Sequence, residues 1–385
     1  MTNATDRNDI ERAAFWLAAW DAQGLHRTGG DGDRAGAEWL AGEARALGAE
    51  VEIEPFALDR LDPVAAFLEL GGERIEGVPV FDAPATGADG VTGRLGGEIA
   101  VAELSPRAVY SGEFEALRRA GQASGLVVVC AGDNPGLGLL NAEQFRTPYG
   151  SPAIHVSSEA RDRVMAALAA GAPGRLVSES RRSRAEACNI IARIAGPADG
   201  AGGAPLVVMT PRSSWWQSTA ERGGGIVCWL ESLRALIARP PRRPVVFTAN
   251  SGHELGHLGL DEFIARRPGW DGPPAEDGAT WVHYGANIGA AGGTLSLVSP
   301  VEELRTLAAA ELTHAGQAYT AAPATLVPSG ETRDIHKAGG HYLTLVGTNP
   351  LFHLPQDRWP GSVDLAAIVR IAAAASRIVR QLAGP

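Results

Sequence analysis

The chain has 385 residues, enough for two structural units, and its 45% hydrophobic and 20% charged residues are typical of a globular enzyme. A formal charge of -10 disfavours nucleic acid or an anionic membrane as a partner, because phosphate-binding faces need clustered Lys and Arg. The sequence has no run of 18 apolar residues, so we expect no membrane span.

The first 20 residues, MTNATDRNDIERAAFWLAAW, carry acidic residues where a secretory signal needs basic ones, and charges interrupt the apolar stretch. We therefore expect a cytoplasmic protein. Cys130, Cys188 and Cys228 are odd in number and widely spaced, and each lies in an apolar run. This pattern favours buried thiols over disulfides or a metal cluster.

Residues 34–58 show apolar positions at helical spacing followed by strand-like alternation, which predicts a helix that leads into an edge strand. From residue 59 to 180 the chain consists of short strand-like runs separated by Gly and Pro, clearest at 97–104, 125–132 and 151–157. This change in the sequence pattern predicts that residues 59–180 form a small β-rich domain inserted into the domain that the remaining residues form.

The remaining chain alternates between buried strands and helices. Apolar, β-branched runs predict strands buried on both faces, and amphipathic runs predict helices. The strands are expected at 189–196, 205–211 and 244–252, and the helices at 225–238 and 363–383. Together they predict an α/β domain, built from residues 1–58 and 181–385, with a mixed central sheet flanked by helices.

One motif matches a known metal site. His253-Glu254-Leu255-Gly256-His257 fits HExxH, which on a helix presents two imidazoles to zinc, with Glu254 as general base. In zincins this motif lies within a long helix, whereas here it directly follows a buried strand through Ser251-Gly252. A zincin site would need a third protein ligand within reach of His253 and His257; otherwise His257 is a packed or surface histidine.

The order of these segments resembles the di-zinc aminopeptidase and glutamate carboxypeptidase family. The similarity covers most of the chain and rests on residues 26–56, 185–196, 223–236, 241–266 and 349–379. The resemblance implies a zinc-exopeptidase fold in which residues 59–180 are a protease-associated domain that overhangs the pocket as a lid. It also implies hydrolysis of an amide or related bond.

Residue by residue, the resemblance implies that only half of the di-metal site is retained. Glu221 matches the carboxylate that bridges two zinc ions, and Glu254 and His353 match two ligands of the second ion. In the family, a His and an Asp complete the site of the first ion. No His stands near residues 209–212, where the first of these ligands is expected, and Ala286 stands where the Asp is expected. The general-base position is occupied by His253.

Glu221, Glu254 and His353 are therefore the predicted ligands of one zinc or other divalent metal, converging at the carboxyl ends of the central strands. Three protein ligands leave an open position for water, and His253 is the predicted proton acceptor beside it. The alternative is a site without metal, either a metal-free enzyme that is not a peptidase or an inactive binding or regulatory homologue.

The predicted substrate is a small molecule or short peptide-like compound. Arg212 could fix a carboxylate through paired hydrogen bonds, and Trp215 and Trp216 could form flat walls. These two Trp could equally form core or dimer contacts, which leaves a homo-oligomer open. Further pocket candidates are Asn287, His336 and His341. An ordinary peptide N-terminus is not expected, since residues 330–332 replace the family's Ser-Asp-His.

Overall fold

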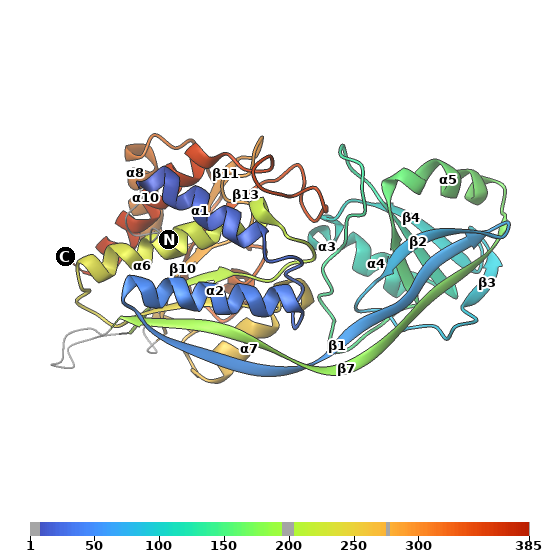
Figure 1. Ribbon diagram of the computed structural model, residues 1–385, viewed down its shortest axis with the longest axis horizontal. Coiled ribbons are helices and arrows are strands. Elements are labelled where there is room, and N and C mark those ends of the chain that lie inside the picture. The colour runs from blue at the N-terminus through green and yellow to red at the C-terminus, as the bar shows by residue number, and fades with distance from the viewer. Residues whose placement is uncertain (1–7, 195–203, 275–277, 385) are drawn as a thin grey trace.

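The computed structural model describes residues 8–194, 204–274 and 278–384. In this part of the chain one long mixed sheet runs through the molecule, with helices packed on both of its faces at one end (Figure 1). The predicted α/β class with a mixed central sheet is therefore confirmed. None of the described helices combines the length and the apolarity that crossing a membrane would need.

The strands divide between the two ends of the sheet. Those toward the N-terminus are β1 (Glu50–Leu70), β2 (Glu73–Pro79), β3 (Val91–Arg94), β4 (Ile99–Leu104), β5 (Gly125–Cys130), β6 (Ala153–Val156) and β7 (Pro173–Ile194). Those that follow are β8 (Leu206–Pro211), β9 (Val245–Asn250), β10 (Thr280–Tyr284), β11 (Leu295–Val298), β12 (Thr320–Ala321) and β13 (His341–Gly347).

The helices include those predicted from apolar spacing. They are α1 (Asp9–Asp21), α2 (Asp31–Leu47), α3 (Ala108–Ser111), α4 (Glu113–Ala120), α5 (Arg161–Ala169), α6 (Gly224–Ala238), α7 (Leu258–Ala265), α8 (Glu302–His314), α9 (Thr332–Lys337) and α10 (Leu365–Leu382). Their ends follow local chemistry: the Asp364 side chain accepts a hydrogen bond from the Ala367 amide at 2.9 Å to cap α10, and Gly48 ends α2 in the left-handed conformation.

The strand order is β12-β11-β13-β10-β8-β9-β7-β1-β2-β6-β5-β4, with β3 paired to β7 off this path. At the centre β13, β10, β8 and β9 are parallel, and β7 joins them in the antiparallel sense. The central strands β8 and β9 are buried along their whole length, as their continuous apolar runs predict.

Two hydrophobic layers enclose this central part. One face packs on α1, α2, α6, α8 and α10 through residues such as Trp20, Trp229 and Ile371, and the other packs on α7 and α9 through Phe263 and Ile335. Burial of these layers is the main stabilising contribution to the fold. It leaves the carboxyl ends of the parallel strands free to carry loops.

A two-stranded ribbon links the two ends of the molecule. β1 and β7 are 21 and 22 residues long and pair continuously from Glu50 and Arg193 to Leu70 and Gly174, apart from one irregularity near Pro63 (Figure 1). The predicted boundaries after residues 58 and 180 therefore fall inside strands. Beyond the ribbon, β4, β5 and β6 form a parallel group with its own hydrophobic cores.

Candidate functional site

The loops that follow the parallel strands carry most of the chemically active side chains. Strand β9 leads into His253, β10 into Asn287, and β13 into His353. Glu221 lies in a single π-helical turn, Thr219–Gly223, that opens α6. The candidate site therefore lies at the carboxyl edge of the sheet, where open α/β sheets place their ligands.

The HExxH motif does not lie on one helix. His253, Glu254 and Leu255 form a 3-10 turn between Gly252 and Gly256, both with positive φ, and His257 precedes α7 with φ of 63°. A left-handed conformation is uncommon for histidine and is often found at functional sites. This backbone brings both histidine rings to one place while it directs Glu254 elsewhere, so the zincin arrangement is absent.

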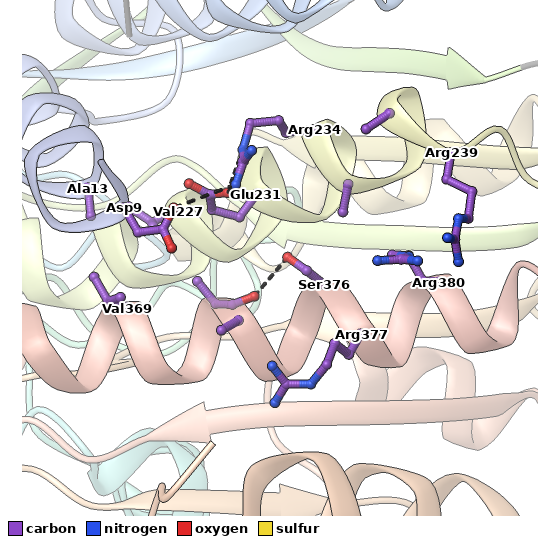
Figure 2. A pocket seen from close by; sticks show the side chains of 14 residues that line it. Asp9, Ala13, Val227, Glu231, Arg234, Arg239, Val369, Ser376, Arg377 and Arg380 are labelled. Carbon is purple, nitrogen blue, oxygen red and sulfur yellow. Dashed lines mark hydrogen bonds and ion pairs between the residues drawn. The ribbon is translucent and has the colours of Figure 1, made fainter. Parts of the chain in front are cut away.

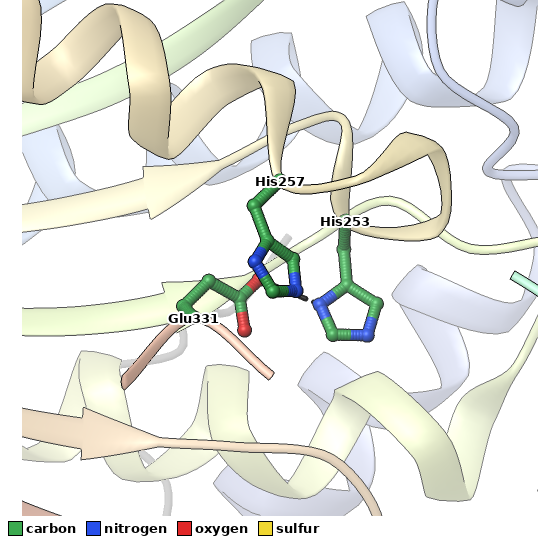
Figure 3. Close-up of side chains that lie close together, drawn as sticks. All are labelled: His253, His257 and Glu331. Atoms are coloured by element: carbon green, nitrogen blue, oxygen red, sulfur yellow. Dashed lines mark hydrogen bonds and ion pairs between the residues drawn. The ribbon is translucent and has the colours of Figure 1, made fainter. Parts of the chain in front are cut away.

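His253, His257 and Glu331 converge. Among the described residues they are the one group of three potential ligands whose ligand atoms all lie within 4.8 Å of one another (Figure 3). Figure 3 shows the two rings and the carboxylate pointing toward a common point from the turn after β9, the start of α7 and the segment before α9. All three side chains are buried.

One hydrogen bond joins two members of this group, and another supports it from outside. His253 Nδ1 lies 2.6 Å from Glu331 Oε1, and His257 Nδ1 lies 2.8 Å from Asp334 Oδ2. The second oxygen of Glu331 lies 3.4 Å from Nε2 of the buried His283. A carboxylate that fixes the outer nitrogen of an imidazole is the usual support of a metal-binding histidine.

Burial and neighbouring charges set the protonation of the group. Burial, helped by Arg222, lowers the pKa of His253 to about 4, so its ring is neutral at neutral pH. Burial alone would raise the pKa of Glu331, but its contacts with His253 and His283 outweigh burial and hold that pKa well below its usual range. Asp334 likewise overcomes burial and raises the pKa of His257.

A cavity of about 120 Å³ opens onto these side chains. It is lined by Arg107, His253, His283, Ala286, Asn287, Ser329, Gly330, Glu331, Val346, Gly347 and Phe352. Arg107 comes from the segment between β4 and α3, and its guanidinium lies 5.5 Å from the ring centre of Phe352. The inserted segment therefore contributes one wall, and the space suits a small chemical group.

The three ligands predicted from the family resemblance do not form such a group. Glu221 and His353 lie together, with 3.3 Å between Oε1 and Nε2. The carboxylate of Glu254 instead accepts hydrogen bonds from the Thr28 amide at 2.8 Å, the Thr28 hydroxyl at 2.7 Å and the Ser213 hydroxyl at 2.6 Å. Its oxygens are thus occupied by protein donors.

Three predicted substrate residues have structural roles instead. Arg212 is fully buried and binds both the carbonyl and the carboxylate of Asp33 at 2.6 Å. Trp215 is buried against Phe81, with ring centres 4.6 Å apart, and the Trp216 indole donates to the His353 carbonyl at 2.8 Å. Neither tryptophan lines the cavity, because Trp215 belongs to a hydrophobic cluster with Phe56 and Leu139, and Trp216 packs against that cluster.

The other pocket candidates separate into one that lines the cavity and two that do not. Asn287 lies on the cavity wall with φ of 65°, and its side-chain oxygen has no hydrogen-bond partner among the described residues. His341 begins β13, so about 20 Å of strand separates it from the site at the other end. His336 bonds the Tyr342 hydroxyl at 3.0 Å near that same far end.

Sequence patterns gave no role to Glu331, His283, Arg107 or Arg222. Glu331 lies in residues 330–332, which replace the family's Ser-Asp-His. This difference was the one feature of the sequence that could have indicated a role for Glu331. His283 is a lone imidazole in an otherwise apolar strand, β10, which gives a weaker signal. Arg107 belongs to the insert, so no spacing within the catalytic part of the sequence indicates it.

A larger cavity of about 440 Å³ lies between α1, α6 and α10, away from these histidines (Figure 2). Its acidic residues are engaged: Glu231 pairs with Arg12 and Arg234, and Asp9 pairs with Arg12. Its lining contains neither histidine nor cysteine. Its two carboxylates are held in these ion pairs, and its one hydroxyl, that of Ser376, donates to the Ala372 carbonyl at 2.8 Å, so the smaller cavity is the better candidate active site.

Solved structures with the same fold are zinc aminopeptidases and related peptidases. The zinc aminopeptidase from Bacillus subtilis superposes with a TM-score of 0.75 at 17% identity, covering 95% of this chain and 94% of that one. A peptidase M28 precursor from Shewanella amazonensis SB2B gives 0.74 at 15% identity, covering 99% and 96%. An aminopeptidase from Aneurinibacillus sp. strain AM-1 gives 0.71 at 16% identity, covering 98% and 95%.

Neither the family models nor the curated protein sequences contain a match to this chain. The identities to the solved structures are low, and the likeness therefore concerns the fold. It confirms the predicted zinc-exopeptidase fold over nearly the whole chain.

Proposed function

We propose that this chain, which has the fold of the zinc aminopeptidases, hydrolyses an amide bond of a small molecule in the cavity beside His253 and Glu331. One observation carries the proposal: a buried group of two imidazoles and one carboxylate lies at the carboxyl edge of the sheet, and two of its members, His253 and Glu331, line a small cavity. Two histidines and one glutamate are a ligand set of catalytic zinc.

The side chains fit one divalent metal such as zinc. His257 is fixed through Nδ1 by Asp334, which leaves Nε2 as its ligand atom. Oε2 of Glu331 has no hydrogen-bond partner among the described residues. Ligand atoms of tetrahedral zinc lie roughly 3.3 Å apart, so the 2.6 Å contact between His253 and Glu331 would widen by a fraction of an ångström. A metal held there would supply a Lewis acid that polarises the amide carbonyl.

His283 is the proton acceptor in this arrangement. Its ring lines the cavity, and neither ring nitrogen has a hydrogen-bond partner in the described part of the chain. Nε2 faces the Glu331 carboxylate at 3.4 Å, which favours the tautomer with its proton on Nε2. Nδ1 is then free to accept a proton from an attacking water and to return it to the leaving amine.

A metal-free hydrolase is the second candidate, and the 2.6 Å hydrogen bond between His253 and Glu331 favours it. In that case Glu331 orients the imidazole, as the third member of a catalytic triad does. His253 Nε2 is buried without a partner among the described residues, and the ring is neutral at neutral pH. His253 would then be the proton acceptor, the role that the sequence predicts for it.

The charges of the cavity suggest a substrate with an anionic group. Apart from histidine, its charged lining residues are Arg107 and Glu331, and Glu331 is engaged by His253. No carboxylate among the described residues forms an ion pair with Arg107, so its guanidinium can bind a substrate carboxylate. An N-acyl amino acid would present both this carboxylate and an amide bond. This proposal gives the inserted segment the role of a substrate-binding wall.

The test is to measure metal content and turnover on a panel of N-acyl amino acids before and after treatment with a chelator. We expect about one metal per chain, loss of turnover with the chelator, and recovery on addition of zinc. Turnover without metal and without sensitivity to the chelator would support His253 as base. A folded protein that binds these compounds but never hydrolyses them would be a binding homologue.

A further inference from the structure

The side chains that match the family's metal ligands do not fit a metal ion at their own position. The oxygens of Glu254 receive three hydrogen bonds, two at Oε1 from Thr28 and one at Oε2 from Ser213, so protein donors already hold this carboxylate. The carboxylate is fully buried, and burial raises its pKa despite these donors. A metal at this position would therefore have to compete with a satisfied network.

Glu221 already has a cation. Nη2 of Arg222 lies 2.7 Å from Glu221 Oε1, and the Ser214 hydroxyl donates to Oε2 at 2.8 Å. Both charged side chains are buried, with 0% and 1% of each residue exposed, so they are removed from bulk solvent together. Burial raises the pKa of Glu221, but the guanidinium and His353 outweigh it and hold that pKa well below its usual range.

His353 completes the array. Its Nδ1 lies 2.6 Å from the Leu139 carbonyl, and a carbonyl can only accept, so Nδ1 carries a proton. Nε2 faces Glu221 Oε1 at 3.3 Å, the oxygen that Arg222 contacts. Arg222 is itself held in place, because its Nε donates to the Ser213 carbonyl at 2.7 Å. The positive charge is therefore fixed at the carboxylate by the protein.

We infer that the guanidinium of Arg222 takes the place of a metal ion as the counter-ion of Glu221, so that Glu221, Glu254 and His353 hold no metal. A buried carboxylate needs a cation nearby. In the di-zinc arrangement that the sequence resembles, metal ions meet this need. Here an arginine one residue along the chain meets it permanently. The inference concerns side chains outside the group His253, His257 and Glu331, and it stands independently of the proposed function.

The first test is equilibrium dialysis of the purified protein against zinc, comparing the wild type with Glu221→Gln and His353→Gln. We expect the metal bound per chain to be the same in all three proteins. A decrease of about one equivalent in either variant would overturn the inference, because it would make that residue a ligand.

The second test measures the coupling between the two charges through thermal midpoints. Arg222→Met leaves Glu221 buried without its cation and should lower the midpoint by about 5 °C. Adding Glu221→Gln to that variant removes the stranded charge and should bring the midpoint back to within about 2 °C of the wild type. Arg34→Met, which removes an exposed ion pair with Asp31, is the matched control and should change little.

The two tests together decide the matter even if the protein binds no metal at all. In that case the dialysis gives zero for every variant and the proposed metal at His253, His257 and Glu331 fails. The coupling of Glu221 to Arg222 is still measured. If the double variant is as unstable as Arg222→Met, Arg222 is not the counter-ion of Glu221 and the inference is wrong.

Discussion

His257 and Asp334 are joined by a 2.8 Å hydrogen bond between Nδ1 of the ring and Oδ2 of the carboxylate. Because this contact engages Nδ1, it leaves Nε2 of His257 as the ligand atom next to His253 and Glu331. Asp334 keeps its ionised form, because the hydrogen bond and charge of His257 outweigh burial and lower its pKa. The pair has the chemistry of a carboxylate that supports a metal-binding imidazole.

Replacing Asp334 by Asn should therefore weaken metal binding without removing it. Loss of the supporting carboxylate typically costs 10–100-fold in metal affinity, and we expect a decrease on the order of that range. Zinc titration against a competing chelator measures the change. Asp31→Asn, at an exposed ion pair on α2, is the control and should bind zinc as the wild type does. Equal affinity in both variants would mean that Asp334 does not support a ligand.

Replacing His283 by Gln should lower turnover and leave the metal in place. A lost acid-base group typically costs about two to four orders of magnitude, and Gln cannot accept the proton. Metal content and thermal midpoint, measured on the same sample, show whether the site and fold survive. His336→Gln, near the far end of β13, is the control. Normal turnover in the His283 variant would assign the proton transfer to another group.

Replacing Arg107 by Gln should raise KM for acidic substrates by about 10–100-fold and change kcat much less. The guanidinium binds the substrate carboxylate and not the reacting bond. Its loss therefore weakens the ground state and the transition state equally, which raises KM and leaves kcat nearly unchanged. Arg119→Gln, in the same inserted segment and paired with Glu115 on the surface, is the control. If substrates with and without a carboxylate lose equally, Arg107 does not recognise that group.

Acid should destabilise the fold through two buried histidines, His26 and His155, which do not line the cavity. Burial lowers the pKa of both His26 and His155 from 6.5 to about 3. The unfolded chain therefore binds protons between these values that the folded chain cannot, and stability falls as the pH is lowered through that window. At pH 5 each neutral ring costs on the order of 2 kcal/mol.

Denaturant unfolding at pH 7 and pH 5 measures this loss in the wild type and in His155→Gln. The variant should lose less stability between the two values, because one titrating group is gone. His314→Gln, at an exposed position on α8, should lose as much as the wild type. An equal loss in all three proteins would place the acid sensitivity elsewhere.

Much of the fold could be predicted from the sequence because it depends on local patterns. Buried runs such as β8 and β9 carry apolar residues without alternation, and α10 shows an apolar face along its length. The ends of the insert could not be placed in this way. β1 and β7 continue through them without a turn residue that would mark a break.

The site was predicted only in part. HExxH spacing indicated that His253 and His257 could meet, but the direction of their rings depends on the left-handed backbone at Gly252, Gly256 and His257. Their partner Glu331 lies 78 residues beyond His253, and no local pattern joins residues so far apart. The contact between Arg212 and Asp33 could not be predicted for the same reason, because the two residues lie 179 positions apart.

The central claim is that His253, His257 and Glu331 hold one metal on which amide hydrolysis depends. The most direct test is the metal content of the purified wild type and of His257→Gln, measured together with turnover on an N-acyl amino acid. The account predicts about one metal per wild-type chain, and near-complete loss of both metal and turnover in a variant that remains folded. A wild type without metal whose turnover survives chelation, or a His257 variant that keeps its metal, would contradict it.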